Sequence, residues 1–291
     1  MEPADAPPRD LAGAAELIPG TLYALGGLLP LDGRLSWVAE GVEGVAPLAS
    51  YLLLEGDRAL LIDTGAPVFE AQLLAQLDAL VPRPPQLSVL LSRVVEFDSF
   101  GNAAAVLRHL PVDTTYSQFP PDEWLYYRHV HGTAEPPAPT RWVPLKAGVE
   151  AAIGGEGDPG RRLETLHAPL RLLVTAWMYD PATRCLFTSD AFGHAVMPDA
   201  DGPRTVTAAT DTTTLDEVRE HLVAKFDWLE TAELEPLREQ LAEVFGEREI
   251  DMVAPSYGRV LVGRDVVQRH YELVQEALAG LGARAATGGK R

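Results

Sequence analysis

The sequence predicts an α/β fold arranged as an αββα sandwich, with helices on the outer faces of two facing sheets. Short apolar runs alternate with segments of helical periodicity, and the alternation occurs in two roughly repeated halves of the chain. A length of 291 residues and a hydrophobic content of 46% are enough to bury a sizeable core.

In the first half the pattern predicts six strands and three helical segments. The strands are expected at residues 21–25, 36–39, 50–54, 59–63, 87–91 and 114–117. The helical segments are expected at residues 67–80, 103–110 and 122–129, the last as a helix or an aromatic turn. The first of these helices is indicated by Phe69, Leu73, Leu77 and Leu80, which recur at the spacing of one helix face.

In the second half the expected strands are 163–167, 172–178 and 185–188, and the expected helices are 215–226, 232–245 and 265–281. Residues 133–162 are rich in Pro and Gly, and residues 198–214 are polar and rich in Thr. Both segments are predicted as loops, which either cover a pocket or are ordinary surface loops. We expect one domain over residues 13–281, with a flexible arm at 1–12 and a flexible tail at 282–291.

The charge of the chain argues against a nucleic-acid partner. Lys and Arg number 24 against 42 acidic residues, a net charge of −18, whereas phosphate backbones require basic surfaces. An acidic patch could instead face a basic protein partner. The single cysteine, Cys185, excludes an internal disulfide and a cysteine-based metal site.

No apolar run approaches the roughly 20 residues of a membrane span. The first ten residues are acidic and rich in Pro, unlike a signal peptide. We therefore expect a cytoplasmic protein without a membrane partner.

Several sequence blocks occur in the order typical of one known superfamily. The first ends in Asp63-Thr64-Gly65, the second covers 94–99, the third runs from 167 through 193, and the last covers 250–258. Together they resemble the metallo-β-lactamase superfamily and, within it, the branch of flavodiiron and oxygen-binding diiron proteins. The resemblance implies the αββα fold predicted above and a diiron centre held by histidines and carboxylates.

The resemblance places the family's carboxylate ligands on Glu96, Asp98 and Asp190, the last of which corresponds to the bridging aspartate. The family's histidine positions are held by other residues, namely Val94, Ser99, either Arg171 or Leu172 depending on how the spacing is counted, and Tyr257. The resemblance therefore implies a pocket that keeps three carboxylates and loses every family-type histidine.

Such a pocket must balance its negative charge. Iron and zinc sites depend on neutral imidazoles, whereas an all-carboxylate set suits Mg²⁺, Mn²⁺ or Ca²⁺. Without a cation the carboxylates repel one another. We expect Arg171, and as a second possibility Arg93, to take the electrostatic place of the metal, because a guanidinium binds carboxylates in bidentate fashion. The alternative is that Arg171 faces solvent and Leu172 fills the pocket.

Three further side chains are candidates near this pocket. His167 or His194 could serve as a substitute metal ligand or proton donor, although structural hydrogen bonding is the ordinary role for both. Tyr257 either bonds a carboxylate through its hydroxyl or fills the space of the replaced imidazole.

Three functions remain open on this basis. The first is a degenerate metallo-β-lactamase-fold protein without a metal cofactor, acting as a scaffold for binding, sensing or assembly. The second is a diiron protein that binds or reduces oxygen or nitric oxide with iron held by non-standard ligands. The third is a hydrolase-type enzyme that uses the pocket carboxylates directly, with Asp190 as general base. The resemblance also implies a homodimer.

Overall fold

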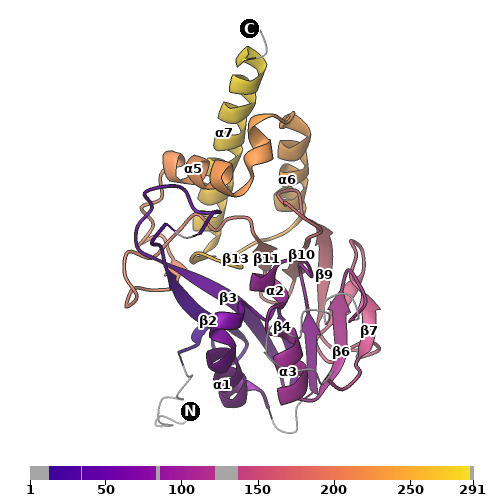
Figure 1. Cartoon of the computed structure of the whole chain (residues 1–291). Helices are drawn as coiled ribbons and strands as arrows, with labels where there is room; N and C mark the ends of the chain where they lie inside the picture. The colour runs from indigo at the N-terminus through magenta and orange to yellow at the C-terminus, as the bar shows by residue number, and fades with distance from the viewer. Residues whose placement is uncertain (1–12, 34, 83–85, 122–136, 289–291) are drawn as a thin grey trace, which may run out of the picture.

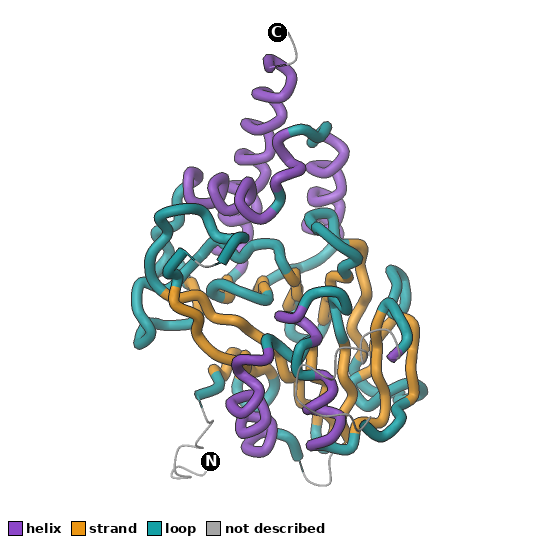
Figure 2. Tube along the Cα trace, in the orientation of Figure 1, coloured by secondary structure: helices purple, strands orange, loops and turns teal. Residues whose placement is uncertain are grey.

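The computed structural model describes residues 13–33, 35–82, 86–121 and 137–288, and forms two facing sheets covered by helices (Figure 1; Figure 2). The predicted arm at 1–12 and the predicted helical segment at 122–129 lie outside the described residues. The chain has the predicted αββα fold.

The first sheet contains seven described strands in sequence order: β1 (Ala15–Ile18), β2 (Leu22–Pro30), β3 (Val45–Glu55), β4 (Arg58–Ile62), β5 (Gln86–Leu90), β6 (Val112–Ser117) and β7 (Arg141–Pro144). Pairing is antiparallel from β1 to β4 and parallel from β4 to β7. Strand β5 therefore lies among parallel neighbours, and its C-terminal end leads into the candidate site.

The second sheet also contains seven described strands, in the order β12 (Thr205–Val206), β14 (Val260–Val262), β13 (Met252–Pro255), β11 (Cys185–Ser189), β10 (Ala176–Asp180), β9 (Arg162–His167) and β8 (Glu150–Ala152). Strand β11 pairs with β13 in parallel and with β10 in antiparallel orientation. It lies at the centre of the sheet, and its C-terminal end reaches the site from the opposite side.

Helices cover the outer face of each sheet. The first sheet is covered by η1 (Pro67–Phe69), α1 (Glu70–Leu80) and α3 (Ala103–His109), with the short α2 (Phe97–Phe100) between strand and helix. The second sheet is covered by α5 (Leu215–Lys225), η3 (Asp227–Glu230), α6 (Glu235–Glu247) and α7 (Arg264–Gly288). Helix α1 forms as predicted, and it buries Leu73, Leu77 and Leu80 against the sheet.

The two sheets share the core between them. Strand β3 is buried on both faces, so that Tyr51 and Leu53 face the second sheet while Leu52 and Leu54 pack under the helices of the first. This follows from the alternation of side chains along a strand. Met178 and Phe187 of the second sheet complete the shared layer. Residues from both halves of the chain are therefore needed to form it.

The structure corrects five of the predicted segments. Residues 36–39 form turns rather than a strand, and the loop predicted at 133–162 contains β7, β8 and the first residue of β9. The strand predicted at 172–178 begins only at Ala176. Helix α7 continues to Gly288, so most of the predicted tail is helical. The loop predicted at 198–214 contains the two-residue strand β12. Strands β1, β13 and β14 are also additional to the prediction, because each is too short to show a pattern of its own.

Candidate functional site

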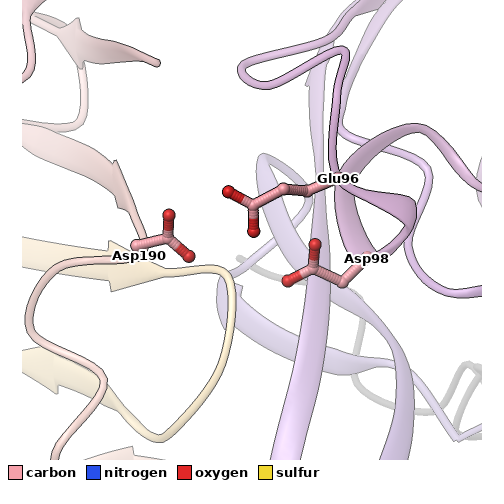
Figure 3. A group of neighbouring side chains, drawn as sticks. All are labelled: Glu96, Asp98 and Asp190. Carbon is pink, nitrogen blue, oxygen red and sulfur yellow. The ribbon is translucent and has the colours of Figure 1, made fainter. Parts of the chain in front are cut away.

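The three carboxylates predicted from the sequence lie together between the two sheets. Glu96 is the N-cap residue of α2, Asp98 lies in its first turn, and Asp190 directly follows β11. Each offers an oxygen atom within 4.8 Å of the others. Figure 3 shows Asp190 approaching from one side and Glu96 and Asp98 from the other.

The turn that presents Asp190 has an unusual backbone. Ser189 and Phe192 flank it with φ angles of 53° and 67°, in the left-handed region that non-glycine residues seldom adopt. Next in the chain, Gly193 packs so closely on Tyr257 that a Cβ atom there would lie 2.7 Å from the tyrosine ring. Such strained turns persist where the surrounding structure holds them, and they are common at functional sites.

Arg93 lies at the centre of the carboxylates. Its side chain is wholly buried, and Nη1 lies 3.0 Å from Asp190 Oδ1 while Nη2 donates to Asp98 Oδ2 at 3.0 Å. Nη1 also donates to Glu96 Oε2. Burial alone would lower the pKa of Arg93, but the charges of Asp190, Asp98 and Glu96 raise it well above its ordinary value. The guanidinium therefore remains charged and binds all three acids.

Lys225 adds a second buried cation. It lies in the last turn of α5, its side chain is 3% exposed, and Nζ lies 2.8 Å from Asp190 Oδ1 and 3.7 Å from Glu96 Oε2. The ammonium also lies 5.4 Å from the centre of the Trp37 ring and 5.7 Å from that of Tyr257, within range of cation–π attraction. Two cations thus approach the same oxygen of Asp190.

A further acid, Asp63, lies behind this cluster. Its oxygens accept hydrogen bonds from Ser92 N and Ser92 Oγ, each at 2.7 Å, and from Ser99 Oγ at 2.6 Å. Burial raises the pKa of Asp63 to about 6, against the lowering effect of Arg93 and of these hydrogen bonds. Ser99, at a histidine position implied by the resemblance, therefore serves the hydrogen-bond network of Asp63.

Tyr257 is buried next to Lys225. Its hydroxyl lies 3.3 Å from both ring nitrogens of His221, and its ring lies 6.4 Å from that of Trp37. Burial, reinforced by the charge of Asp190, raises its pKa well above the ordinary value, so the hydroxyl stays protonated. Of the two roles expected for Tyr257, the contacts favour the filling of space, because within the described part of the chain its hydroxyl contacts His221 and not a carboxylate.

The structure does not bring Arg171 or Leu172 to the carboxylates. Arg171 is exposed and its Nη1 donates to Ala168 O at 2.6 Å, while the side chain of Leu172 is 43% exposed. Both belong to the connection between β9 and β10, where the main chain turns at the surface. The expectation that Arg171 replaces the metal is therefore wrong, and the cations at that place are Arg93, the second possibility, and Lys225.

The two candidate histidines also lie apart from the carboxylate group. His167 is exposed at the end of β9. His194 is buried, and its Nε2 lies 2.7 Å from His270 Nδ1. Among the described residues, the group of acidic, histidine and cysteine donors close enough to share one ion consists of Glu96, Asp98 and Asp190.

Lys225 is not among the site residues predicted from the sequence, although the sequence contains a signal for it. Val218, Leu222 and Lys225 follow one another at spacings of four and three residues, which places the lysine on the buried face of the helix. A lysine on such a face requires a buried anion, because the desolvation of an unpaired ammonium is costly.

The residues present do not fit a diiron centre. The donors are three carboxylates, and Asp190 Oδ1 already lies within 3.0 Å of Arg93 and 2.8 Å of Lys225. Iron ions between these carboxylates would lie against two cationic side chains, and no histidine of the described residues lies close enough to add an imidazole ligand.

Comparison with known proteins supports the fold. A fragment of a diflavin flavoprotein from Nostoc sp. PCC 7120 superposes with a TM-score of 0.67 and 16% identity, covering 96% of this chain and 98% of the fragment. The flavodiiron protein from Giardia intestinalis gives a TM-score of 0.64 at 17% identity, covering 96% of this chain and 61% of that protein. Rubredoxin oxygen:oxidoreductase from Desulfovibrio gigas gives a TM-score of 0.61 at 14% identity, covering 91% of this chain and 61% of that protein.

These structures define the class of fold. The chain has the fold of the metallo-β-lactamase-like domain of flavodiiron proteins, and it spans about 61% of the length of the two full proteins compared. No family model and no curated protein sequence matches the chain. Within the described residues, no helix is both long and apolar enough to cross a bilayer.

Proposed function

We propose that this protein is a degenerate metallo-β-lactamase-fold protein in which Arg93 and Lys225 take the electrostatic place of the metal, and that it acts as a scaffold for binding, sensing or assembly. One observation supports this above others: the guanidinium and the ammonium lie 3.0 and 2.8 Å from the same oxygen of Asp190, the residue that matches the bridging ligand. Internal cations at that oxygen make an added metal unfavourable.

The balance of charge supports a binding role. Arg93 and Lys225 supply two positive charges against three carboxylates, and burial raises the pKa of Glu96, with the charge of Asp190 adding to the rise. Two buried acceptors, Glu96 Oε1 and Asp190 Oδ2, have no hydrogen-bond partner among the described residues. Buried acceptors of this kind favour a ligand that donates hydrogen bonds.

Elemental analysis tests the proposal directly. Protein purified without chelators or a histidine tag, and again after anaerobic loading with iron, is expected to contain far less than one metal per chain. Tightly held iron, zinc or manganese at one or more per chain would overturn it. Iron-loaded protein with an oxo-bridged absorption band and oxygen uptake would establish the diiron alternative instead.

A double variant and a control test whether the two cations, and not only the missing histidine ligands, keep a metal out of the pocket. In Arg93→Ala/Lys225→Ala the three carboxylates lose both cations, and millimolar Mn²⁺ is expected to raise the thermal midpoint, because a hard cation suits carboxylate oxygens. In wild type and in the surface control Arg171→Ala, Mn²⁺ is expected to leave the midpoint unchanged. A similar rise in all three proteins would contradict the assignment of Arg93 and Lys225.

The hydrolase alternative has less support. A general base needs a free lone pair directed at its substrate. Asp190 is wholly buried, and two cations already lie within 3.0 Å of one of its oxygens. Any hydrolytic activity found in the protein should be measured again in Asp190→Asn, since an unchanged rate would remove Asp190 from the mechanism.

We also infer that the protein is a cytoplasmic homodimer. Leu172, Leu173 and Val174 support a protein contact, because their side chains are 43%, 47% and 49% exposed in consecutive positions. Light scattering coupled to size exclusion measures the mass in solution. A monomer at high concentration would refute the dimer, and a change to monomer in Leu173→Glu would place the contact at these residues.

A further inference from the structure

A cavity of about 240 Å³ lies beside Tyr257, separate from the carboxylates described above. Its walls come from residues 38–46, from the turn after Asp190 and from α5. Five of the lining side chains are aliphatic: Val38, Ala39, Val42, Ala46 and Val196. The buried polar side chains of the wall are His194, His221 and Tyr257, and three exposed glutamates also line the cavity. An apolar cavity with a few polar groups is the usual form of a small-molecule site.

His194 belongs to a chain of polar groups that determines its protonation. Asp211 accepts a hydrogen bond from Thr213 N at 3.0 Å and is bonded by Arg269, so it stays ionised. His270 Nε2 lies 3.2 Å from Asp211 Oδ2, and His270 Nδ1 lies 2.7 Å from His194 Nε2. The contact between His270 Nε2 and Asp211 lacks the geometry of a hydrogen bond. Burial lowers the pKa of His270, so its ring carries one proton, and the negative charge of Asp211 favours that proton on Nε2, which leaves the lone pair on Nδ1.

The same reasoning assigns the proton of His194. Since His270 Nδ1 accepts, His194 Nε2 must donate to it, and His194 Nδ1 is left as a bare acceptor. Burial lowers the pKa of His194 well below its ordinary value, with His221 and His270 adding to the effect, so the ring is neutral. His194 is 7% exposed, and its Nδ1 has no hydrogen-bond partner among the described residues. Such a group favours a ligand with a donor.

The other charges around the cavity limit the ligand further. Glu43, Glu217 and Glu220 line the cavity as exposed acids and disfavour an anion. Inside, His221 is neutral, and its pKa is lowered to about 3 by burial and by the nearby Lys225. The positive charge of Lys225 in turn disfavours a cation.

We propose that this cavity binds a small uncharged molecule with an apolar body and one O–H or N–H group, which donates a hydrogen bond to His194 Nδ1. The class includes phenols, small alcohols and primary amides. A dry cavity of roughly 150 Å³ accommodates benzene, so 240 Å³ suits a single substituted ring. The proposal is independent of the metal content of the carboxylate site, because it uses a different set of side chains.

Binding of phenol, toluene and anisole to the full chain tests the proposal. Toluene has the shape of phenol without the hydroxyl, and anisole keeps the oxygen without its proton. We expect phenol to bind about tenfold more tightly than either, as one buried hydrogen bond allows. Dissociation constants from ligand-observed NMR decide this. Equal affinities for the three, or binding of none, would overturn the proposal.

Two variants locate the site. Val42→Trp fills the cavity from a partly exposed position and is expected to abolish phenol binding, whereas Val68→Trp, at a side chain 72% exposed elsewhere on the surface, should leave it unchanged. His194→Leu should reduce the preference for phenol over toluene to near unity. If His194→Leu does not fold, the proposal is still tested by the preference of the wild type for phenol over toluene and anisole and by the effect of Val42→Trp on phenol binding. Undiminished phenol binding in folded Val42→Trp would refute the cavity as the site.

Discussion

Arg93 is the residue on which the carboxylate cluster depends most. Its guanidinium is wholly buried and contacts all three acids, so its removal leaves negative charges without their main partner. Removing one member of a buried ion pair is strongly destabilising, whereas the pair itself adds little over a hydrophobic replacement. The same reasoning applies to Lys225, which shares Asp190 with it.

Arg93→Ala should therefore lower the free energy of unfolding by about 3–5 kcal/mol at pH 7, as measured by urea titration. Arg171→Ala is the matched control, because its guanidinium is exposed, and it should change the value by less than about 0.5 kcal/mol. Equal effects of the two substitutions would show that Arg93 has no special role in neutralising the pocket.

His221 should make the protein less stable in acid. Its pKa is lowered from 6.5 to about 3, first by burial and then by Lys225, so the unfolded chain binds the proton more readily than the folded one. Stability from this group is complete above pH 6.5 and is lost as the pH falls toward 3. At pH 5 the loss is about 2 kcal/mol.

His221→Phe should remove this part of the pH dependence. Urea titration gives the free energy of unfolding at pH 7 and at pH 5. The decrease between these two values is expected to be about 2 kcal/mol smaller in the variant than in wild type. His167→Gln, at an exposed histidine, should retain the full wild-type difference. A pH dependence that is unchanged in His221→Phe would assign the acid sensitivity to other groups, of which His194 is the first to examine.

At the residue scale, the sequence predicted the acids better than their partners. Glu96, Asp98 and Asp190 could be grouped because the family resemblance places carboxylate ligands at these three positions, and the structure brings them together. Arg171 was preferred to Arg93 because it falls on a former ligand position. Spacing along a motif, however, does not give the direction of a side chain at a surface turn, and only tertiary contacts select Arg93.

At the scale of elements, helix α5 positions Lys225. Its N-terminus has a capping box, in which Thr214 Oγ1 accepts from Glu217 N at 3.3 Å and Glu217 Oε2 accepts from Thr214 N at 2.7 Å. These bonds satisfy donors that the first turn of a helix leaves unpaired. The other end of the helix bears the buried ammonium, so the cap and the site belong to one rigid element.

Thr214→Ala should lower the free energy of unfolding by about 1 kcal/mol, because the capping oxygen is lost. Thr214→Ser keeps that oxygen and should remain close to wild type. Thermal melts of both variants followed by circular dichroism provide the comparison. A loss as large in the serine variant as in the alanine variant would indicate that the threonine methyl group, and not the cap, stabilises this end of α5.

Elements with their own periodicity were predicted, and elements that depend on a neighbour were not. Helix α1 repeats its apolar residues at helical spacing, and β3 and β4 form an apolar hairpin. Strands β7 and β8 lie in a segment rich in Pro and Gly and pair with β6 and β9 only in the folded sheets. The apolar run at 172–174 suggested a strand, yet these side chains face solvent.

At the scale of the whole molecule, the site and the core join the same two halves of the chain. Arg93 follows β5 of the first sheet and contacts Asp190, which follows β11 of the second. The layer between the sheets likewise contains Tyr51 and Ile62 from the first and Met178 and Phe187 from the second. Neither sheet can bury its inner face alone, so the two halves should not unfold separately.

Two tryptophans allow this to be measured. Trp142 lies in β7 of the first sheet and Trp177 in β10 of the second. The chain has five tryptophans, so the variants needed are those in which Trp142 or Trp177 is the one tryptophan left, and each then reports on one sheet. We expect urea transitions followed by the two tryptophans to share a midpoint and to coincide with loss of circular dichroism, after correction for the stability of each variant. Cooperative unfolding follows from the shared core, since exposing one inner face exposes the other. Separate midpoints for the two sheets would mean that each is stabilised mainly by its own outer helices.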